Sequence, residues 1–194
     1  NDNIASERSE MVRDSIWTKD PTAVSERFGL VFPGVRPAET RPWAGERWFF
    51  QRRVPRKDPT FVAAGITGSV NARRLRTIVL DAPHNQENSS SEYQRRAVIK
   101  GYNRTIRTRA TGRTPKICIT ARWSADPDVP DLPGYFIQQG WPVLRTPALD
   151  ENDRSVWDYE PAIDEGKRTE ELLLDRERDP SSFLLQFQGI AIFD

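Results

Sequence analysis

Short apolar runs, separated by long polar stretches, set the pattern of this chain. The clearest is the run Ile78-Val79-Leu80, which is preceded by basic residues and followed by Asp81 and Pro83. A β-branched run of this kind predicts a strand buried on both faces, as in the parallel sheet of an α/β domain. Pro83 cannot donate a ladder hydrogen bond, so we expect the strand to stop at about Asp81.

The same patterns predict the other elements. A narrow apolar stripe indicates a surface helix near the start, and Ser91 is placed to cap a helix that begins at Glu92. The expected helices are 4–17, 92–108, 132–139, 165–176 and 180–186, and the expected strands are 60–64, 76–81, 116–121 and 141–146. The alternation of strands and helices predicts an α/β domain.

A long irregular region, 18–59, combines prolines with aromatic residues. Its aromatic cluster consists of Trp43, Trp48, Phe49 and Phe50. We expect this cluster to pack against the sheet. Because arginines follow it directly, stacking on nucleic-acid bases is the alternative.

Composition and charge limit the possible classes of protein only in part. Hydrophobic residues make up 37% of the 194 residues and charged residues 29%, which indicates a large solvated surface or a core completed by neighbours. The formal charge of +1 excludes no partner. No apolar run is long enough to span a membrane, and no signal peptide is visible.

Two residue types occur once each. Cys118 can form no internal disulfide, and its apolar surroundings predict a small buried hydrophobe in a reducing compartment. His84 is the only histidine, so a metal cluster built on several histidines is not expected, and we expect no Ser-His-Asp triad either.

The expected helix 92–108 and its end carry a basic side. Its members are Arg95, Arg96, Lys100, Arg104, Arg107 and Arg109. Such a row is either a solvated face or a track for phosphates or DNA.

Several segments follow one another at a characteristic spacing. They are the run Ile78-Val79-Leu80-Asp81 with Pro83, the basic helix ending near Arg109, residues 117–123 (ICITARW), 132–134, 140–144 and 147–149, and the closing set Trp157, Pro180, Phe183, Gln186, Phe187 and Gln188. In order and spacing they resemble the ATPase domain of the large terminase subunit, the DNA-packaging motor of tailed phages. The first run is similar to that family's Walker B strand, and 117–123 to the strand that leads into its coupling motif. The resemblance covers nearly the whole chain.

The resemblance implies a fold. This is a partial P-loop NTPase fold of the ASCE type, a mainly parallel sheet flanked by helices, in which 1–194 form a single partial ATPase domain. The Walker A strand and loop are missing, since the only Gly-Lys pair, Gly166-Lys167, is followed by Arg168 and preceded by Pro161 where the leading glycine should stand. We therefore expect the chain to begin downstream of Walker A, and the family's nuclease domain to be absent as well.

The resemblance also implies the chemistry, with ATP and Mg²⁺ as cofactors. Asp81 corresponds to the catalytic carboxylate that holds magnesium through its water shell. The alternative for Asp81 is an aspartate that caps the following turn. Thr120 lies in the coupling segment 120–123, which responds to the γ-phosphate. Arg109 and Arg122 are the candidates for an arginine supplied to a neighbouring subunit. The alternative for Arg122 is a structural pair with a nearby aspartate.

Two departures from the family's pattern bear on activity. Ala82 stands where the family usually has an acid that orients the attacking water. Loss of such an acid commonly lowers the rate by orders of magnitude. Glu87 is the candidate substitute. Ala121 stands where a threonine is expected before Arg122, with Thr120 one place earlier.

The function implied is ATP-driven packaging of double-stranded DNA into a procapsid. The expected partners are DNA, the portal protein and the small terminase subunit, with a ring homo-oligomer docked on the procapsid in the host cytoplasm and no membrane. The isolated chain is expected to bind ATP poorly. The alternative, motivated by Ala82 and Ala121, is a catalytically silent structural or DNA-binding subunit.

A third class is a metal-dependent nuclease. It would use Asp81, Asp126, Asp128 and Asp131. Asp81 and the other three aspartates lie on different loops with no shared element, which disfavours it.

Overall fold

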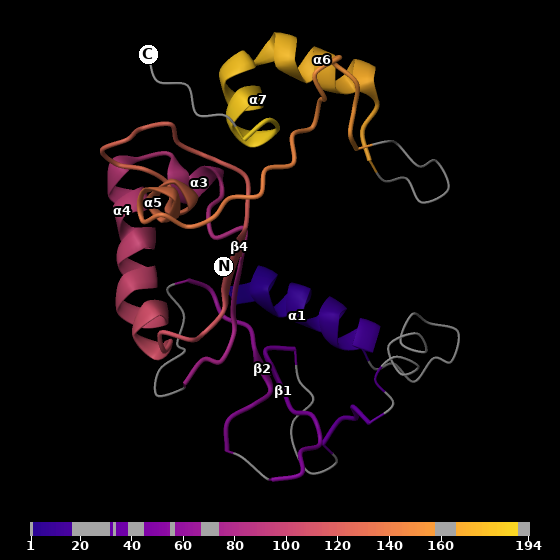
Figure 1. Ribbon diagram of the computed structural model, residues 1–194, viewed down its shortest axis with the longest axis vertical. Helices are drawn as coiled ribbons and strands as arrows, with labels where there is room; N and C mark the ends of the chain where they lie inside the picture. Colours follow the sequence, from indigo (N-terminus) through magenta and orange to yellow (C-terminus); the bar gives the residue numbers. More distant parts are fainter. Residues whose placement is uncertain are drawn as a thin grey trace. The chain divides into compact units, whose positions relative to one another are not determined.

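The computed structural model describes residues 2–16, 32, 34–38, 45–54, 57–66, 74–157 and 166–189 (Figure 1). Two compact units are present. The first consists of Asn1–Leu75 and Arg104–Thr111, and the second of Arg76–Asn103 and Gly112–Asp194. The chain is a mixed α/β protein with a small parallel sheet, as the alternation of elements predicted. The expected single partial ATPase domain stays a prediction.

The first unit contains one helix and a two-stranded antiparallel sheet. Its elements are α1 (Asp2–Ile16), β1 (Arg47–Trp48) and β2 (Phe61–Val62). The helix agrees with the predicted 4–17. The predicted strand 60–64 is confirmed only in its central part, and β1 was not predicted.

Trp48 organises the core of the first unit. Its ring stacks on Phe61 with centroids 4.6 Å apart and meets Phe50 edge-on. Its indole Nε1 donates a 3.1 Å hydrogen bond to the hydroxyl of Ser9 on α1. Trp48 is therefore a packing residue, as predicted for the cluster, with α1 and β2 as its neighbours. Trp43 lies outside the described residues.

The second unit contains most of the regular structure. Its elements are β3 (Ile78–Asp81), α3 (Gln86–Ser89), α4 (Glu92–Gly101), β4 (Lys116–Ile119), α5 (Leu132–Gln138), α6 (Thr169–Arg178) and α7 (Pro180–Gln186). A π-helical turn, η1 (Tyr102–Ile106), and a 3-10 turn, η2 (Arg107–Arg109), follow α4 along the chain, and from Arg104 on they belong to the first unit. The short helix α3 was not predicted. Helix α6 starts four residues later than predicted, while α5 and α7 fall where they were expected.

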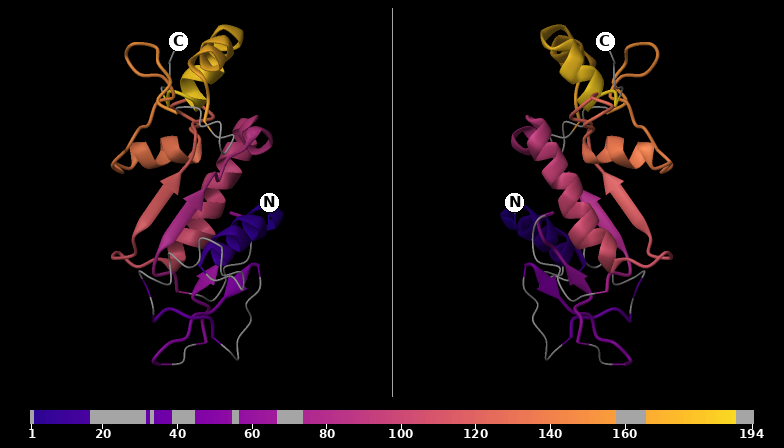
Figure 2. Two further views of the ribbon diagram at one scale, coloured as in Figure 1. Left: turned by 90° about the vertical axis from the view of Figure 1, so that its right-hand side faces the viewer. Right: turned by 90° about the vertical axis from the view of Figure 1, so that its left-hand side faces the viewer.

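Strands β3 and β4 pair in parallel, with Ile78 opposite Lys116 and Asp81 opposite Ile119. Figure 2 shows the two arrows side by side with α4 beside them. A parallel connection requires a crossover, and α4 is the helix between the two strands. Both strands end within two residues of their predicted bounds.

Burial alternates along β3. Ile78 and Leu80 are buried, whereas Val79 is 56% exposed, and Ile117 and Ile119 of β4 share its open face. The prediction of burial on both faces is therefore wrong. Its physical basis was the β-branched composition, which is the same for a strand covered on one face or on two.

A separate apolar cluster joins the two C-terminal helices. It consists of Ala148, Leu149, Leu172 and Phe183. The side chain of Gln188 closes this region by accepting from the N–H of Leu149 and donating to its carbonyl. The cluster fixes α6 and α7 to the segment that precedes them.

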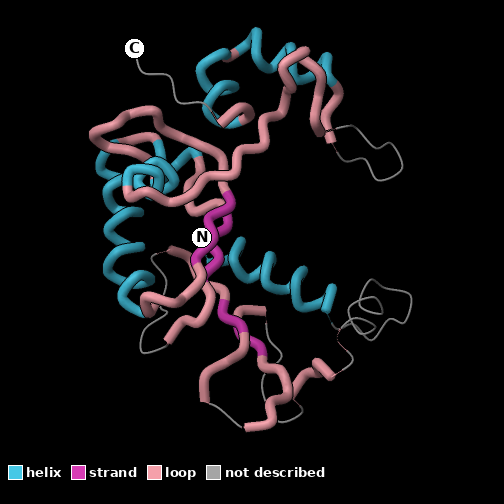
Figure 3. Tube along the Cα trace, in the orientation of Figure 1, coloured by secondary structure: helices cyan, strands magenta, loops and turns pink. Residues whose placement is uncertain are grey.

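The predicted strand 141–146 is wrong. Figure 3 draws this stretch as loop, and Leu144 is 94% exposed. A strand needs a neighbour for its backbone donors and acceptors, and no ladder to 141–146 exists in the described part of the chain. The apolar composition alone did not reveal that absence.

Cys118 on β4 provides a first test. Burial raises the pKa of its thiol to about 12. At pH 8 the thiolate fraction would then be about one in ten thousand, so a thiol-specific disulfide reagent should label the folded chain very slowly. Labelling should become fast in urea. Rapid labelling of the folded chain at pH 8 would contradict the interpretation of Cys118 as a buried hydrophobe.

Candidate functional site at the carboxyl ends of strands β3 and β4

The site lies where the two parallel strands end. Asp81 is opposite Ile119, and the N–H of Ala82 continues the ladder with a 2.9 Å hydrogen bond to the carbonyl of Ile119. Because parallel strands end at one edge, exposed Asp81 lies beside the start of segment 120–123. Ligands of open α/β sheets bind at this edge.

The backbone turns sharply after Asp81. Ala82 has a φ of 40°, in the left-handed region that favours glycine. A non-glycine residue pays roughly 1–2 kcal/mol for this conformation. Such strain often accompanies functional sites. Here the strained residue is the one that directly follows Asp81.

Arg122 is held by Asp131. Its Nε lies 3.0 and 3.1 Å from the two carboxylate oxygens, and its Nη2 donates to the carbonyl of Ser124 at 2.7 Å. This is the structural pair that sequence analysis gave as the alternative. The catalytic role of Arg122 stays a prediction, and it would require the guanidinium to leave this partner.

Asp131 accepts more than the arginine. Its side chain is 0% exposed and accepts hydrogen bonds from the backbone N–H groups of Trp123 (2.6 Å), Ser124 (3.2 Å) and Gly134 (2.9 Å). The last of these caps α5, because Asp131 is its N-cap residue. One carboxylate therefore fixes both the segment after β4 and the start of α5.

The remaining predicted site residues lie in different settings. Thr120 donates its hydroxyl to the carbonyl of Ala121 at 2.9 Å. Glu87 is exposed in the first turn of α3. Arg109 belongs to the first unit, and its buried Nε has no hydrogen-bond partner among the described residues. The roles proposed for these three residues stay predictions.

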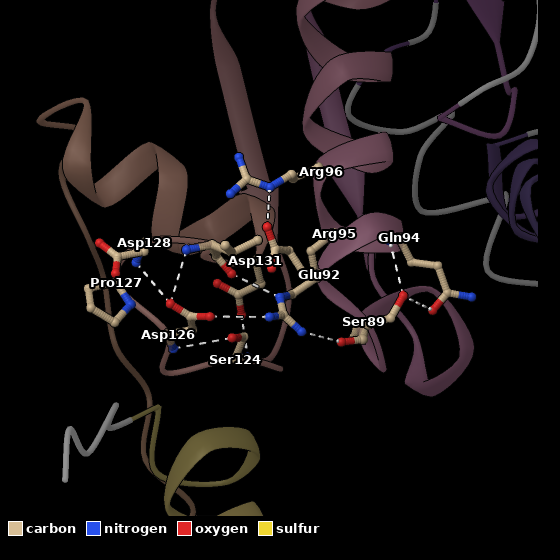
Figure 4. A network of polar contacts seen from close by, with 12 residues as sticks. Ser89, Glu92, Gln94, Arg95, Arg96, Ser124, Asp126, Pro127, Asp128 and Asp131 are labelled. Atoms are coloured by element: carbon tan, nitrogen blue, oxygen red, sulfur yellow. Dashed lines mark hydrogen bonds and ion pairs between the residues drawn. The ribbon is translucent and has the colours of Figure 1, made fainter.

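Arg95 is held by contacts within the protein. It donates to the carbonyls of Val129 (2.8 Å) and Ser89 (2.9 Å), and it pairs with Asp126 at 3.4 Å (Figure 4). It thus connects α4 to the acidic loop, residues 124–131, which contains Asp126, Asp128 and Asp131. Its neighbour on the helix, Arg96, pairs with exposed Glu92 instead. Charge periodicity alone gave both arginines the same interpretation.

The acidic loop is organised by its own backbone. Asp126 accepts from the N–H groups of Asp128 and Val129, and these hydrogen bonds, with a smaller contribution from Arg95, hold the pKa of Asp126 below its usual value. No set of three or more acidic, cysteine or histidine side chains is placed to hold a metal ion within the described ranges. Asp81 alone still fits magnesium, which is commonly held by one or two carboxylates, waters and substrate phosphates.

His84 was missed as a site neighbour. It is only 2% exposed, and its Nε2 accepts a 2.8 Å hydrogen bond from the N–H of Leu132 at the start of α5. The turn after β3 is therefore connected to α5. No spacing in the sequence indicated this contact between residues 48 positions apart.

No protein-family model matches the sequence, and no curated protein does either. In the described part of the chain, no helix combines the length and the apolar character needed to cross a bilayer. A function for this chain is therefore inferred from the geometry at the ends of β3 and β4.

Replacing Asp131 tests how much its buried carboxylate stabilises the fold. In Asp131→Asn the guanidinium of Arg122 loses its buried counter-charge, which typically costs about 3–5 kcal/mol. We expect a loss of that order in the free energy of unfolding, measured by urea denaturation. The matched control is Asp128→Asn in the same loop, an exposed position where the change should stay within about 0.5 kcal/mol. Equal effects of the two variants would contradict the assignment.

Ala82→Gly tests the strained turn. Relief of about 1–2 kcal/mol of strain should outweigh the roughly 0.5–1 kcal/mol of extra unfolded-chain entropy that glycine brings. The variant should therefore be slightly more stable in urea. Ala97→Gly, at an exposed position within α4, should lose about 1 kcal/mol. Destabilisation of both variants would show that Ala82 is not strained.

Proposed function

We propose that this chain forms part of the ATPase module of a terminase large subunit, with a P-loop NTPase fold that binds ATP and Mg²⁺. The proposal is supported by one observation above all: Asp81 and Ile119 are paired at the end of a parallel two-stranded sheet. A carboxylate at that edge, next to a loop from the neighbouring strand, is the arrangement by which nucleotide hydrolases hold magnesium and respond to the γ-phosphate.

Each residue has a role under this proposal. Asp81 holds magnesium through water, and Thr120 with the segment that follows responds to the γ-phosphate. Glu87 orients the attacking water in place of Ala82. Arg109 is the better candidate to act in a neighbouring subunit, because Arg122 is already bound by Asp131.

The wider setting follows from the resemblance. The parent protein would drive double-stranded DNA into a procapsid as a ring homo-oligomer, in contact with the portal protein and the small terminase subunit. It would work in the host cytoplasm while docked on the procapsid.

The second candidate function is a catalytically silent structural or DNA-binding subunit. The observation that favours it is the turn at Ala82, which provides neither a carboxylate nor a relaxed backbone next to Asp81. Under this hypothesis Asp81 holds no magnesium used in hydrolysis, and binding to DNA is independent of nucleotide.

Paramagnetic NMR tests the nucleotide site. Manganese–ATP should broaden the amide signals of residues 81–82 and 119–123, because Mn²⁺ replaces Mg²⁺ at oxygen ligands. Asp81→Asn should abolish this local broadening, and Asp128→Asn should leave it intact. Weak binding suffices for this measurement, which suits a chain without a Walker A motif. Broadening centred on 126–128 in place of these residues would contradict the proposal.

Hydrolysis separates the two candidate functions. ATP turnover by the parent protein that double-stranded DNA stimulates, and that Asp81→Ala abolishes, would support the motor. Manganese–ATP binding by the parent protein without turnover would favour the silent subunit. DNA binding should weaken steeply with salt in either case, because contacts to phosphates release counterions.

A further inference from the structure

His84 is a buried bridge between two loops that lie far apart in the sequence. Its Nε2 accepts from the N–H of Leu132 at 2.8 Å, and its Nδ1 lies 3.2 Å from the hydroxyl of Ser89. Leu132 is the first residue of α5, so the contact satisfies one of the N–H groups that a helix start leaves without a partner. His84 follows β3, and Ser89 is the last residue of α3.

These contacts determine the protonation state of the ring. A backbone N–H can only donate, so Nε2 must carry a lone pair and the neutral ring must carry its proton on Nδ1. That proton then points to the hydroxyl oxygen of Ser89, which in turn lies 3.4 Å from the side-chain oxygen of Asn88. A doubly protonated imidazole cannot make the bond to Leu132, because both of its nitrogens are donors.

The groups around the ring oppose its protonation on balance. Burial is the largest cause and lowers the pKa of His84 below its ordinary value of 6.5, and Arg95 on α4 acts in the same direction. Asp131, at the start of α5, and Asn88, on α3, raise the pKa without overcoming the burial. The charge of Asp131 is already shared with Arg122 and three backbone donors.

We propose that His84 is a proton-operated latch: the neutral ring holds the turn after β3 to the start of α5, and protonation releases it. The latch does not depend on the proposed ATPase function. When the ring is protonated, the N–H of Leu132 loses its acceptor and faces another donor, so the ring must swing out to water. Asp131 still caps Gly134, and α5 therefore stays helical while its link to segment 82–89 opens.

The direction of the pH effect follows from the lowered pKa. The open state titrates near 6.5 and the closed state at a lower pH, so the closed latch is fully favoured above 6.5. As the pH falls below 6.5, the open state takes up the proton first. Between the pKa of the closed state and that of the open state, each fall of one pH unit raises the ratio of open to closed molecules about tenfold.

NMR of the intact chain tests the latch directly, since His84 is its only histidine. At pH 7.5 the imidazole nitrogen shifts should report the tautomer protonated at Nδ1. On acidification the ring should titrate below 6.5. Over the same range, amide exchange at Leu132, corrected for the intrinsic rate, should accelerate by up to about tenfold per pH unit, while Gly134 changes less.

His84→Gln is the matched variant. The glutamine side-chain oxygen reaches about as far as Nε2 and can accept from Leu132 without titrating in this range. In this variant, amide exchange at Leu132, corrected for the intrinsic rate, should no longer depend on pH between 7.5 and 5.5. In His84→Phe the corrected exchange should be fast over the whole range. An imidazole of the wild-type chain that titrates at 6.5 or above, or whose titration leaves the Leu132 amide unchanged, would overturn the proposal. The wild-type titration decides this even where a variant fails to fold.

Discussion

The buried carboxylate of Asp131 is the interaction on which the second unit depends. It neutralises Arg122, accepts from the backbone of Trp123 and Ser124, and caps α5 through Gly134. A buried charge is tolerated only when it is paired and hydrogen-bonded, and here both conditions are met by groups from a single loop and helix start. This loop follows β4 directly, so its course is fixed at the edge where Asp81 lies.

Three polar contacts connect the elements around this carboxylate. His84 joins the turn after β3 to α5, and Arg95 joins α4 to the acidic loop at Val129 and Asp126. Among the residues that the structure describes, apolar packing covers one face of the β3–β4 sheet, and Val79 is exposed on the other. The loops at the carboxyl ends of the strands are held by buried apolar side chains such as Val129 and Leu132 and also by hydrogen bonds, which are directional and sensitive to the charge state of their partners.

Local patterns predicted the elements better than their surroundings. Strand β3 was predicted from its β-branched run and Pro83, because those signals act within a few residues, and α5 and α7 lie where they were predicted. Burial of Val79 and the strand at 141–146 were wrong, since both depend on partners that a single stretch cannot specify. The roles of Arg95 and His84 were missed for the same reason: each has a partner more than 30 positions away, Val129 for Arg95 and Leu132 for His84. The location of the candidate site, at the end of β3 beside the segment after β4, was predicted from the sequence. The contacts that hold the site together were not predicted.

The Asp131 contacts also limit how a site at this edge can move. If Arg122 swung out towards a ligand alone, it would leave an unpaired buried carboxylate, which is far costlier than moving the pair intact. Any response of segment 120–124 to a ligand should therefore carry Asp131 and the start of α5 with it as one body. The bond between His84 and Leu132 is then the link between this body and the turn that follows Asp81. A ligand held by Asp81 would act on α5 through that bond, and its effect would depend on whether the imidazole is neutral.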